Sequence, residues 1–88
     1  MITIQGYKNL SYRDFQLALH KALTDSEKST LQVAAQINVK AEQTVKNSFR
    51  TDIQAVSDEV MTNVMKAVGL SGFVIWIFGT RYYYVKTK

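Results

Sequence analysis

The sequence predicts a small, mainly α-helical α+β domain, with four to five short helices followed by a C-terminal β-hairpin. Apolar residues recur every three to four positions over most of residues 12–68, which is the spacing of packed helices. Residues 73–85 instead hold a dense run of β-branched and aromatic residues around a glycine, which is typical of two paired strands. With 88 residues, no proline and no internal repeat, the chain is predicted to form a single domain over residues 1–88.

The first elements follow from alternation and from a capping residue. Ile2, Thr3 and Ile4 alternate as a short strand would, and such a strand could join the hairpin. Ser11 is a candidate N-cap for a first helix over about residues 12–24, with the carboxylate of Asp14 in its first turn. The predicted apolar face of this helix consists of Phe15, Leu19, Ala22 and Leu23.

A second and a third helix follow a polar loop. Ser29 and Gln32 have the spacing of a capping box, which opens the second helix. Asn38 is expected to end it, because asparagine tolerates the left-handed backbone conformation better than most residues. The third helix is predicted from about residue 41 to residue 50. The inward residues of the second helix are predicted to be Leu31, Ala34 and Ile37.

A fourth helix follows a connector over residues 51–56. Ser57 is its expected N-cap, and two acidic residues follow in the first turn, where the helix dipole favours negative charge. Gly69 is expected to end it. Its apolar stripe is Val60, Met61, Val64, Met65 and Val68.

The predicted hairpin is apolar on both faces. With a two-residue turn at Gly79 and Thr80, Ile75, Ile77, Tyr82 and Tyr84 share one face, and Val74, Trp76, Tyr83 and Val85 share the other. A monomer needs to bury only one such face, so we expect the second face or an edge to meet another copy of the chain. The alternative is that the N-terminal strand and the first helix cover it. The candidate dimer residues are Val74, Trp76, Phe78, Tyr83 and Val85.

The composition narrows the functional classes. The chain has no cysteine, which excludes a disulfide, a thiolate metal site and a cysteine nucleophile. The N-terminus does not have the pattern of a signal peptide, and the apolar stretch over residues 70–78 is shorter than the roughly 20 residues of a membrane helix. We therefore expect a cytoplasmic protein without a membrane partner. With His20 as the only histidine and four dispersed glycines, no enzyme, metal, cofactor or small-molecule ligand is predicted.

The predicted third helix has an outward face that suits the edges of bases. On a helical wheel centred on Val45, this face contains no carboxylate. Amide side chains can bond adenine and cationic side chains can bond guanine, and the net charge of +4 favours a polyanionic partner. On an isolated helix, however, such a face is commonly only solvated surface. The face consists of Lys40, Gln43, Asn47 and Arg50, flanked by Thr44 and Lys46.

The preceding helix supplies a more specific pattern. Ala34, Ile37, Asn38 and Val39 have the spacing of the first helix and turn of a helix-turn-helix, and this stretch resembles the Cro and phage-repressor (lambda-repressor-like, XRE-type) superfamily. In that family, the small residue lets the two helices cross closely and the valine fills the angle between them. The resemblance covers most of residues 10–72, and the terminal strands are similar in plan to those of Cro-type members. It implies a lambda-repressor-like helical bundle with the helix-turn-helix at about residues 29–50.

The resemblance also implies a function. It predicts a repressor-like transcriptional regulator in a bacterial or phage-infected cell, binding a palindromic operator in double-stranded DNA as a homodimer. The interval between Val39 and Thr44 is one residue longer than is usual in this family, so which residue lies deepest in the groove stays open. The implied base contacts are Gln43, Thr44, Asn47 and Arg50, and the implied phosphate contacts are Ser29, Thr30, Gln32, Lys40 and Lys46.

Two other interpretations stay open. The chain could be a protein-interaction module, such as an antitoxin-like or phage accessory protein, that uses the aromatic hairpin to bind a partner. The hairpin could also contact DNA as a wing, with Arg81 and Lys86 toward the phosphates. We rank the wing lower, because a helix intervenes between the recognition helix and the hairpin.

Overall fold

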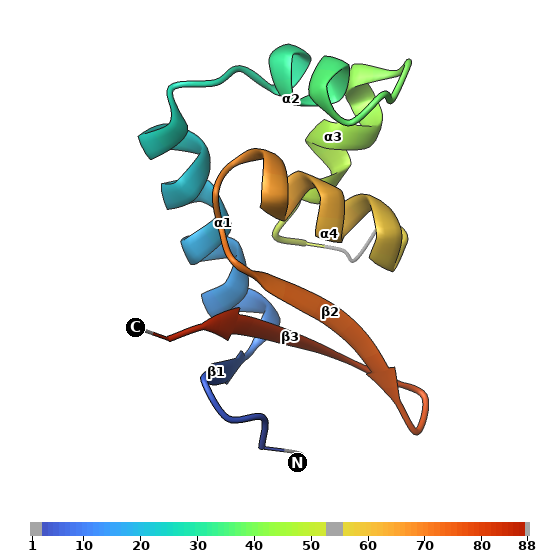
Figure 1. Ribbon diagram of the computed structural model, residues 1–88. Helices are drawn as coiled ribbons and strands as arrows, with labels where there is room; N and C mark the ends of the chain where they lie inside the picture. The colour runs from blue at the N-terminus through green and yellow to red at the C-terminus, as the bar shows by residue number, and fades with distance from the viewer. Residues whose placement is uncertain (1–2, 53–55, 88) are drawn as a thin grey trace.

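Figure 1 shows the computed structural model of the chain, which describes residues 3–52 and 56–87. Over these residues the protein is an α+β domain with four helices and one three-stranded antiparallel sheet, as predicted at this level. The helices lie on one side of the sheet (Figure 1). The elements are β1 (Tyr7–Leu10), α1 (Tyr12–Ser26), α2 (Thr30–Gln36), α3 (Glu42–Ser48), α4 (Asp58–Ala67), β2 (Gly72–Ile77) and β3 (Thr80–Lys86).

The helices begin at the capping residues that the sequence indicates. Ser11 and Ser57 each accept a hydrogen bond from the backbone N–H three residues later, at 3.2 and 3.3 Å. Ser29 and Gln32 form a complete capping box at the start of α2. These side chains satisfy backbone donors that have no partner within the helix. The N-caps predicted for the first, second and fourth helices are therefore confirmed.

Two helices end in the Schellman geometry. At the end of α2, Asn38 has a φ of 64°, the Val39 N–H donates to the Ala34 carbonyl at 2.9 Å, and the Asn38 N–H donates to the Ala35 carbonyl at 3.3 Å. At the end of α4, Gly69 has a φ of 80° and makes the equivalent pattern. Both predicted helix ends are confirmed.

The core lies between the helices and the facing side of the sheet. The prediction that Leu31 points inward is wrong, because this side chain is 62% exposed. Leu31 lies roughly 110° around α2 from the centre of the group formed by Val33, Ala34 and Ile37, so burying that group turns it outward. The fully buried apolar side chains include Phe15, Leu19, Val33, Val45, Met61, Val64 and Met65.

The sheet has the order β1-β3-β2, so the last strand of the chain is the central one. The predicted strand over residues 2–4 is wrong where it can be compared, because Thr3 and Ile4 lie in no strand; Ile2 lies outside the described residues. The Tyr7 N–H donates to the Ile4 carbonyl at 3.0 Å in a turn that precedes β1. β1 then pairs with β3 from Tyr7 opposite Lys86 to Leu10 opposite Tyr83.

The hairpin turn lies one residue earlier than predicted, at Phe78 and Gly79, so the predicted register is wrong. Both turn residues have positive φ, 50° and 77°, as a type I′ turn requires. Thr80 is β-branched and fits a strand better than such a turn. The pairing shifts by two residues, to Ile77 with Thr80 and Ile75 with Tyr82. A shift of two preserves the side-chain faces, so the predicted membership of each face holds.

None of the helices among the described residues is both long enough and apolar enough to cross a membrane.

Candidate nucleic-acid interface

The α2–α3 pair is the part of the structure that corresponds to the predicted helix-turn-helix. α2 and α3 lie side by side, on the far side of the helical layer from the sheet (Figure 1). Ala34 is 2% exposed and Val45 is fully buried, so the small residue of α2 and the central valine of α3 both lie in the core. α3 begins at Glu42, and Ala41 is its exposed N-cap rather than part of the apolar stripe.

The outward face of α3 presents a pair of amides. Gln43 is exposed, and its Nε2 donates a hydrogen bond to Oδ1 of Asn47 one turn later, at 3.0 Å. This bond fixes the two side chains relative to each other. The Gln43 Oε1 acceptor and the Asn47 Nδ2 donors then remain for an external partner. Thr44, on the same helix, is half-buried.

The cations near α3 differ in how they are held. Lys40 is exposed and has no hydrogen bond or ion pair within the residues that the structure describes. Lys46 lies 3.8 Å from the Glu42 carboxylate, a long contact between two partly exposed groups that contributes little. Lys40 and Lys46 can therefore both turn toward an anion.

Arg50 is held more firmly than the lysines. Its Nε and Nη2 donate to the two carboxylate oxygens of Asp52 at 3.0 and 2.6 Å. These hydrogen bonds raise the pKa of the guanidinium. The two guanidinium donors of Arg50 that could bond guanine therefore already bond the Asp52 carboxylate. Of the four predicted base contacts, Arg50 is the one whose side chain must exchange a partner first.

The predicted phosphate contacts at the start of α2 have roles within the protein. Ser29 and Gln32 hold each other in the capping box, and both are exposed. Thr30 donates from Oγ1 to Oε2 of Glu42 at 2.5 Å, which connects α2 to the first turn of α3. These side chains order the helix pair in the free protein.

Three side chains of α1 contact the C-terminal end of α3, and none of them is among the predicted site residues. Gln16 Nε2 donates to the Ser48 carbonyl at 2.8 Å, His20 Nε2 lies 3.0 Å from the Phe49 carbonyl oxygen, and the Tyr12 hydroxyl donates to the Arg50 carbonyl. The only sequence signal is their spacing of four residues, which places them on one face of α1.

The hairpin residues proposed for a dimer divide into two groups. Tyr83 is 2% exposed and stacks on Phe15, with ring centroids 4.5 Å apart, so its assignment to a dimer surface is wrong. Val74 and Val85 are half-buried and pack against the core. Val74 and Val85 face the helices because their side of the sheet covers the core. Two predicted residues remain exposed, Trp76 at 55% and Phe78 at 102%.

Arg81 also faces inward, which removes one of the two residues expected to contact phosphates in the wing interpretation. Its side chain is 6% exposed; Nε donates to the Asp58 carboxylate at 2.7 Å, and Nη2 donates to the Val56 carbonyl at 2.6 Å. The guanidinium also lies 5.4 Å from the ring centroid of Trp76. Arg81 therefore fastens the hairpin to the start of α4.

Comparison of the chain with protein-family models, with curated proteins and with solved structures gives no match.

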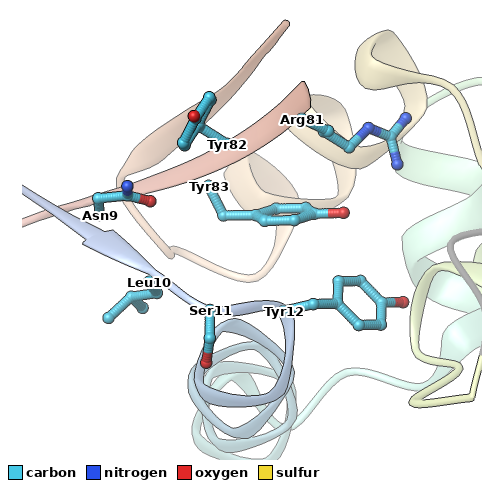
Figure 2. A pocket seen from close by; sticks show the side chains of 7 residues that line it. All are labelled: Asn9, Leu10, Ser11, Tyr12, Arg81, Tyr82 and Tyr83. Atoms are coloured by element: carbon cyan, nitrogen blue, oxygen red, sulfur yellow. The ribbon is translucent and has the colours of Figure 1, made fainter. Parts of the chain in front are cut away.

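The hollow in Figure 2 lies between the end of β1, the start of α1 and the first residues of β3, and has a volume of about 320 Å³. Tyr12 and Tyr83 lie one above the other with their hydroxyls pointing the same way, and Tyr82 points elsewhere (Figure 2). Burial raises the pKa of the Tyr12 and Tyr83 phenols. The hollow is lined by Asn9, Leu10, Ser11, Tyr12, Arg81, Tyr82 and Tyr83.

Proposed function

We propose that this chain is a sequence-specific double-stranded DNA-binding protein of the helix-turn-helix class, acting as a repressor-like transcriptional regulator. The observation that carries the proposal is the α2–α3 pair, joined through the left-handed Asn38, with the bonded Gln43–Asn47 amides on the exposed face of α3. An α-helix fits the major groove, where base pairs present distinct patterns of donors and acceptors. The similarity to Cro and phage repressors in residues 34–39 supports the same conclusion.

The amide pair favours adenine among the bases. Adenine offers an acceptor at N7 and a donor at N6, and it is matched by one donor and one acceptor on the protein. Gln43 retains its oxygen as an acceptor and Asn47 retains its nitrogen as a donor after their mutual bond. We therefore expect at least one adenine within each half-site.

The cations around α3 would supply the contacts that do not depend on sequence. Lys40, just before α3, and Lys46, within it, are both exposed, and neither has a strong partner among the described residues. Phosphate contacts of this kind fix the register of a protein on the duplex and make binding dependent on salt.

A homodimer on a palindromic operator is part of the proposal. β2 is an edge strand, so the backbone groups on its outer side have no partner within the sheet. Ile75 and Trp76, on opposite faces of the distal half of the hairpin, and Phe78 at its tip are exposed apolar side chains near this edge. An apolar surface next to an open edge is suited to contact with a second copy. A dimer that covers an operator would act by excluding or recruiting polymerase.

The test is selection of bound sequences from a random duplex pool, followed by titration of the winners at several salt concentrations. We expect inverted half-sites about one helical turn apart and a linear fall of log affinity with log salt. Gln43→Ala and Asn47→Ala should each relax the preference at particular base pairs, by about 1–3 kcal/mol for a lost bidentate contact. Gln5→Ala removes an exposed amide in the turn before β1 and is the matched control.

A protein-interaction module is the second candidate, because Phe78 is fully exposed at the tip of the hairpin and Trp76 is beside it. The two candidates make opposite predictions. If changes at Trp76 or Phe78 abolished the only detectable interaction while Gln43→Ala and Asn47→Ala had no effect, the DNA-binding proposal would be refuted.

A further inference from the structure

Side chains of α1 bond the backbone at the C-terminal end of α3. The Ser48, Phe49 and Arg50 carbonyls follow one another in the chain, from the last residue of α3 to the second residue after it. The N–H groups of Phe49 and Arg50 turn back to earlier carbonyls, at Lys46 and Asn47. The three later carbonyls point out of the helix instead, where α1 meets them.

Three side chains of α1 bond these three carbonyls, one each. Gln16 bonds the first at 2.8 Å, His20 the second at 3.0 Å, and the Tyr12 hydroxyl the third. The three residues are four positions apart, so they form one row along α1. We call this row the α1 clamp (Tyr12, Gln16 and His20).

The members of the α1 clamp are also ordered among themselves and by packing. Gln16 Nε2 donates a second hydrogen bond to the Tyr12 hydroxyl at 3.0 Å. Gln16 is 1% exposed, so its position is fixed by the surrounding core. The His20 ring packs edge-on against Phe49, with centroids 5.4 Å apart. The bonds to the three carbonyls and the contact of His20 with Phe49 restrain the end of α3 relative to α1, and the bond between Gln16 and Tyr12 orders the clamp itself.

α3 needs such restraint because it is only seven residues long. A helix of this length is marginal by itself, so tertiary contacts determine its direction. Its start has no side-chain cap, and the bond from Thr30 to Glu42 is the polar connection there. Val45 anchors the middle of the helix in the core. The α1 clamp is thus the polar connection at the end that carries Asn47.

We propose that the α1 clamp is a positioning device that sets the angle of α3, and hence determines how accurately Gln43 and Asn47 meet base edges. This inference rests on the proposed DNA-binding function. Its residues touch no base and act through α3. Loss of a clamp bond leaves the cations around α3 in place, so binding to any duplex persists. The selective component of binding decreases, because it requires the amides to be correctly placed.

The test uses the full chain and four variants. Gln16→Met removes the buried donor at nearly constant volume. His20→Leu removes the exposed donor, and His20→Gln keeps an amide N–H that can restore the bond. Tyr82→Phe removes a hydroxyl from the sheet and is the control. Three quantities are measured: the urea midpoint, amide hydrogen exchange at residues 47–50, and the affinity ratio of the selected duplex to a scrambled duplex at one salt concentration.

We expect Gln16→Met and His20→Leu to remain folded and to exchange the amides of residues 47–50 faster than the wild type. Their affinity ratio should fall by about 2- to 12-fold, the range that one hydrogen bond contributes. The salt dependence should be unchanged, because no phosphate contact is lost. His20→Gln should recover most of the ratio, and Tyr82→Phe should leave it unaltered. Should Gln16→Met fail to fold, the His20 pair gives the same comparison at an exposed position.

Faster exchange without a change in the affinity ratio would overturn the positioning role, and so would an unchanged exchange rate in folded variants. A wild-type protein with no sequence preference would refute the proposed function and the role of the clamp in base recognition together. The exchange measurements on the free protein separate these failures, because they report on the contact between α1 and α3 without DNA.

Discussion

Replacement of Asp52 by asparagine tests the electrostatics of the proposed interface most directly. Arg50 is tied to Asp52 through two hydrogen bonds of 3.0 and 2.6 Å, and both side chains are substantially exposed. The replacement removes the negative charge and weakens the bidentate bond. Arg50 is then free to contact a phosphate at the end of α3. We therefore expect Asp52→Asn to bind duplex DNA more tightly than the wild type.

The size of the effect follows from counterion release. One additional phosphate contact makes the plot of log affinity against log salt steeper by about 0.9. Between 200 and 50 mM salt, a fourfold change, this corresponds to about a 3.5-fold larger gain in affinity for the variant than for the wild type. Fluorescence anisotropy of a labelled duplex, titrated at both salt concentrations, measures this ratio.

The control is Asp25→Asn, which makes the same change in net charge on α1. Asp25 pairs with Lys21 at 3.1 Å, and both side chains are exposed. If Asp25→Asn steepened the salt dependence as much as Asp52→Asn did, the effect would come from net charge and not from Arg50. Parallel salt plots for Asp52→Asn and the wild type would refute the reasoning about Arg50.

Three further outcomes are expected. Arg81→Met should lower the free energy of unfolding, measured in urea, by about 2 kcal/mol, because it removes charge-assisted hydrogen bonds of a nearly buried guanidinium. The exposed control Lys86→Met should lower it by less than about 0.5 kcal/mol. Equal losses in the two variants would contradict the role of Arg81. Phe78→Asn should raise the free energy of unfolding by about 1 kcal/mol, because asparagine accepts a φ of 50° more readily than phenylalanine; destabilisation would show that the tip packs within the protomer. Burial raises the pKa of Tyr83, so the contribution of its neutral phenol to stability is complete below the unfolded pKa of about 10 and is lost as the pH rises through the higher folded pKa. Tyr83→Phe should therefore flatten the decline of stability at alkaline pH, measured by urea unfolding. An unaltered decline would exclude Tyr83 as its source.

The starts of α1, α2 and α4 and the ends of α2 and α4 could be predicted from the sequence because they depend on neighbouring residues. The end of α1 at Ser26 and the shorter span of α3, Glu42–Ser48, differ from the predicted ranges. A serine at an N-cap reaches a donor three residues away, and Asn38 and Gly69 need only their own backbone freedom to end a helix. The buried positions of α4 follow in the same way from its 3.6-residue period.

The strand register and the inward turn of Tyr83 could not be predicted with the same rules. The turn position depended on whether Phe78 or Thr80 would take a positive φ, and composition favours neither strongly. β1 was missed because Tyr7–Leu10 pairs with residues at the other end of the chain, and its pattern is not clearly alternating. Tyr83 could be assigned to the core only when the sheet was placed against Phe15.

Only the part of the candidate site that depends on local spacing within α3 could be predicted from the sequence. Val45, the centre of the apolar side predicted for α3, is fully buried, so the helical wheel places the inward side of this helix correctly. The ion pair of Arg50 joins residues two positions apart across the end of α3, beyond the part of the helix that the wheel describes. The α1 clamp connects residues roughly 30 to 40 positions apart in the chain, and local spacing contains no information about such contacts.

The strand order has a consequence for how the chain folds. β3 is the last element of the described chain and the only strand that pairs with both others, so no part of the sheet can form before residues 80–86 are available. The pairing of Tyr7 with Lys86 joins residues far apart in the sequence, and long-range pairings of this kind slow folding. During synthesis the helices can form early, whereas the β1 segment has no strand partner in the described sheet until residues 80–86 have left the ribosome. We therefore expect sheet formation to be the slow, late step of folding.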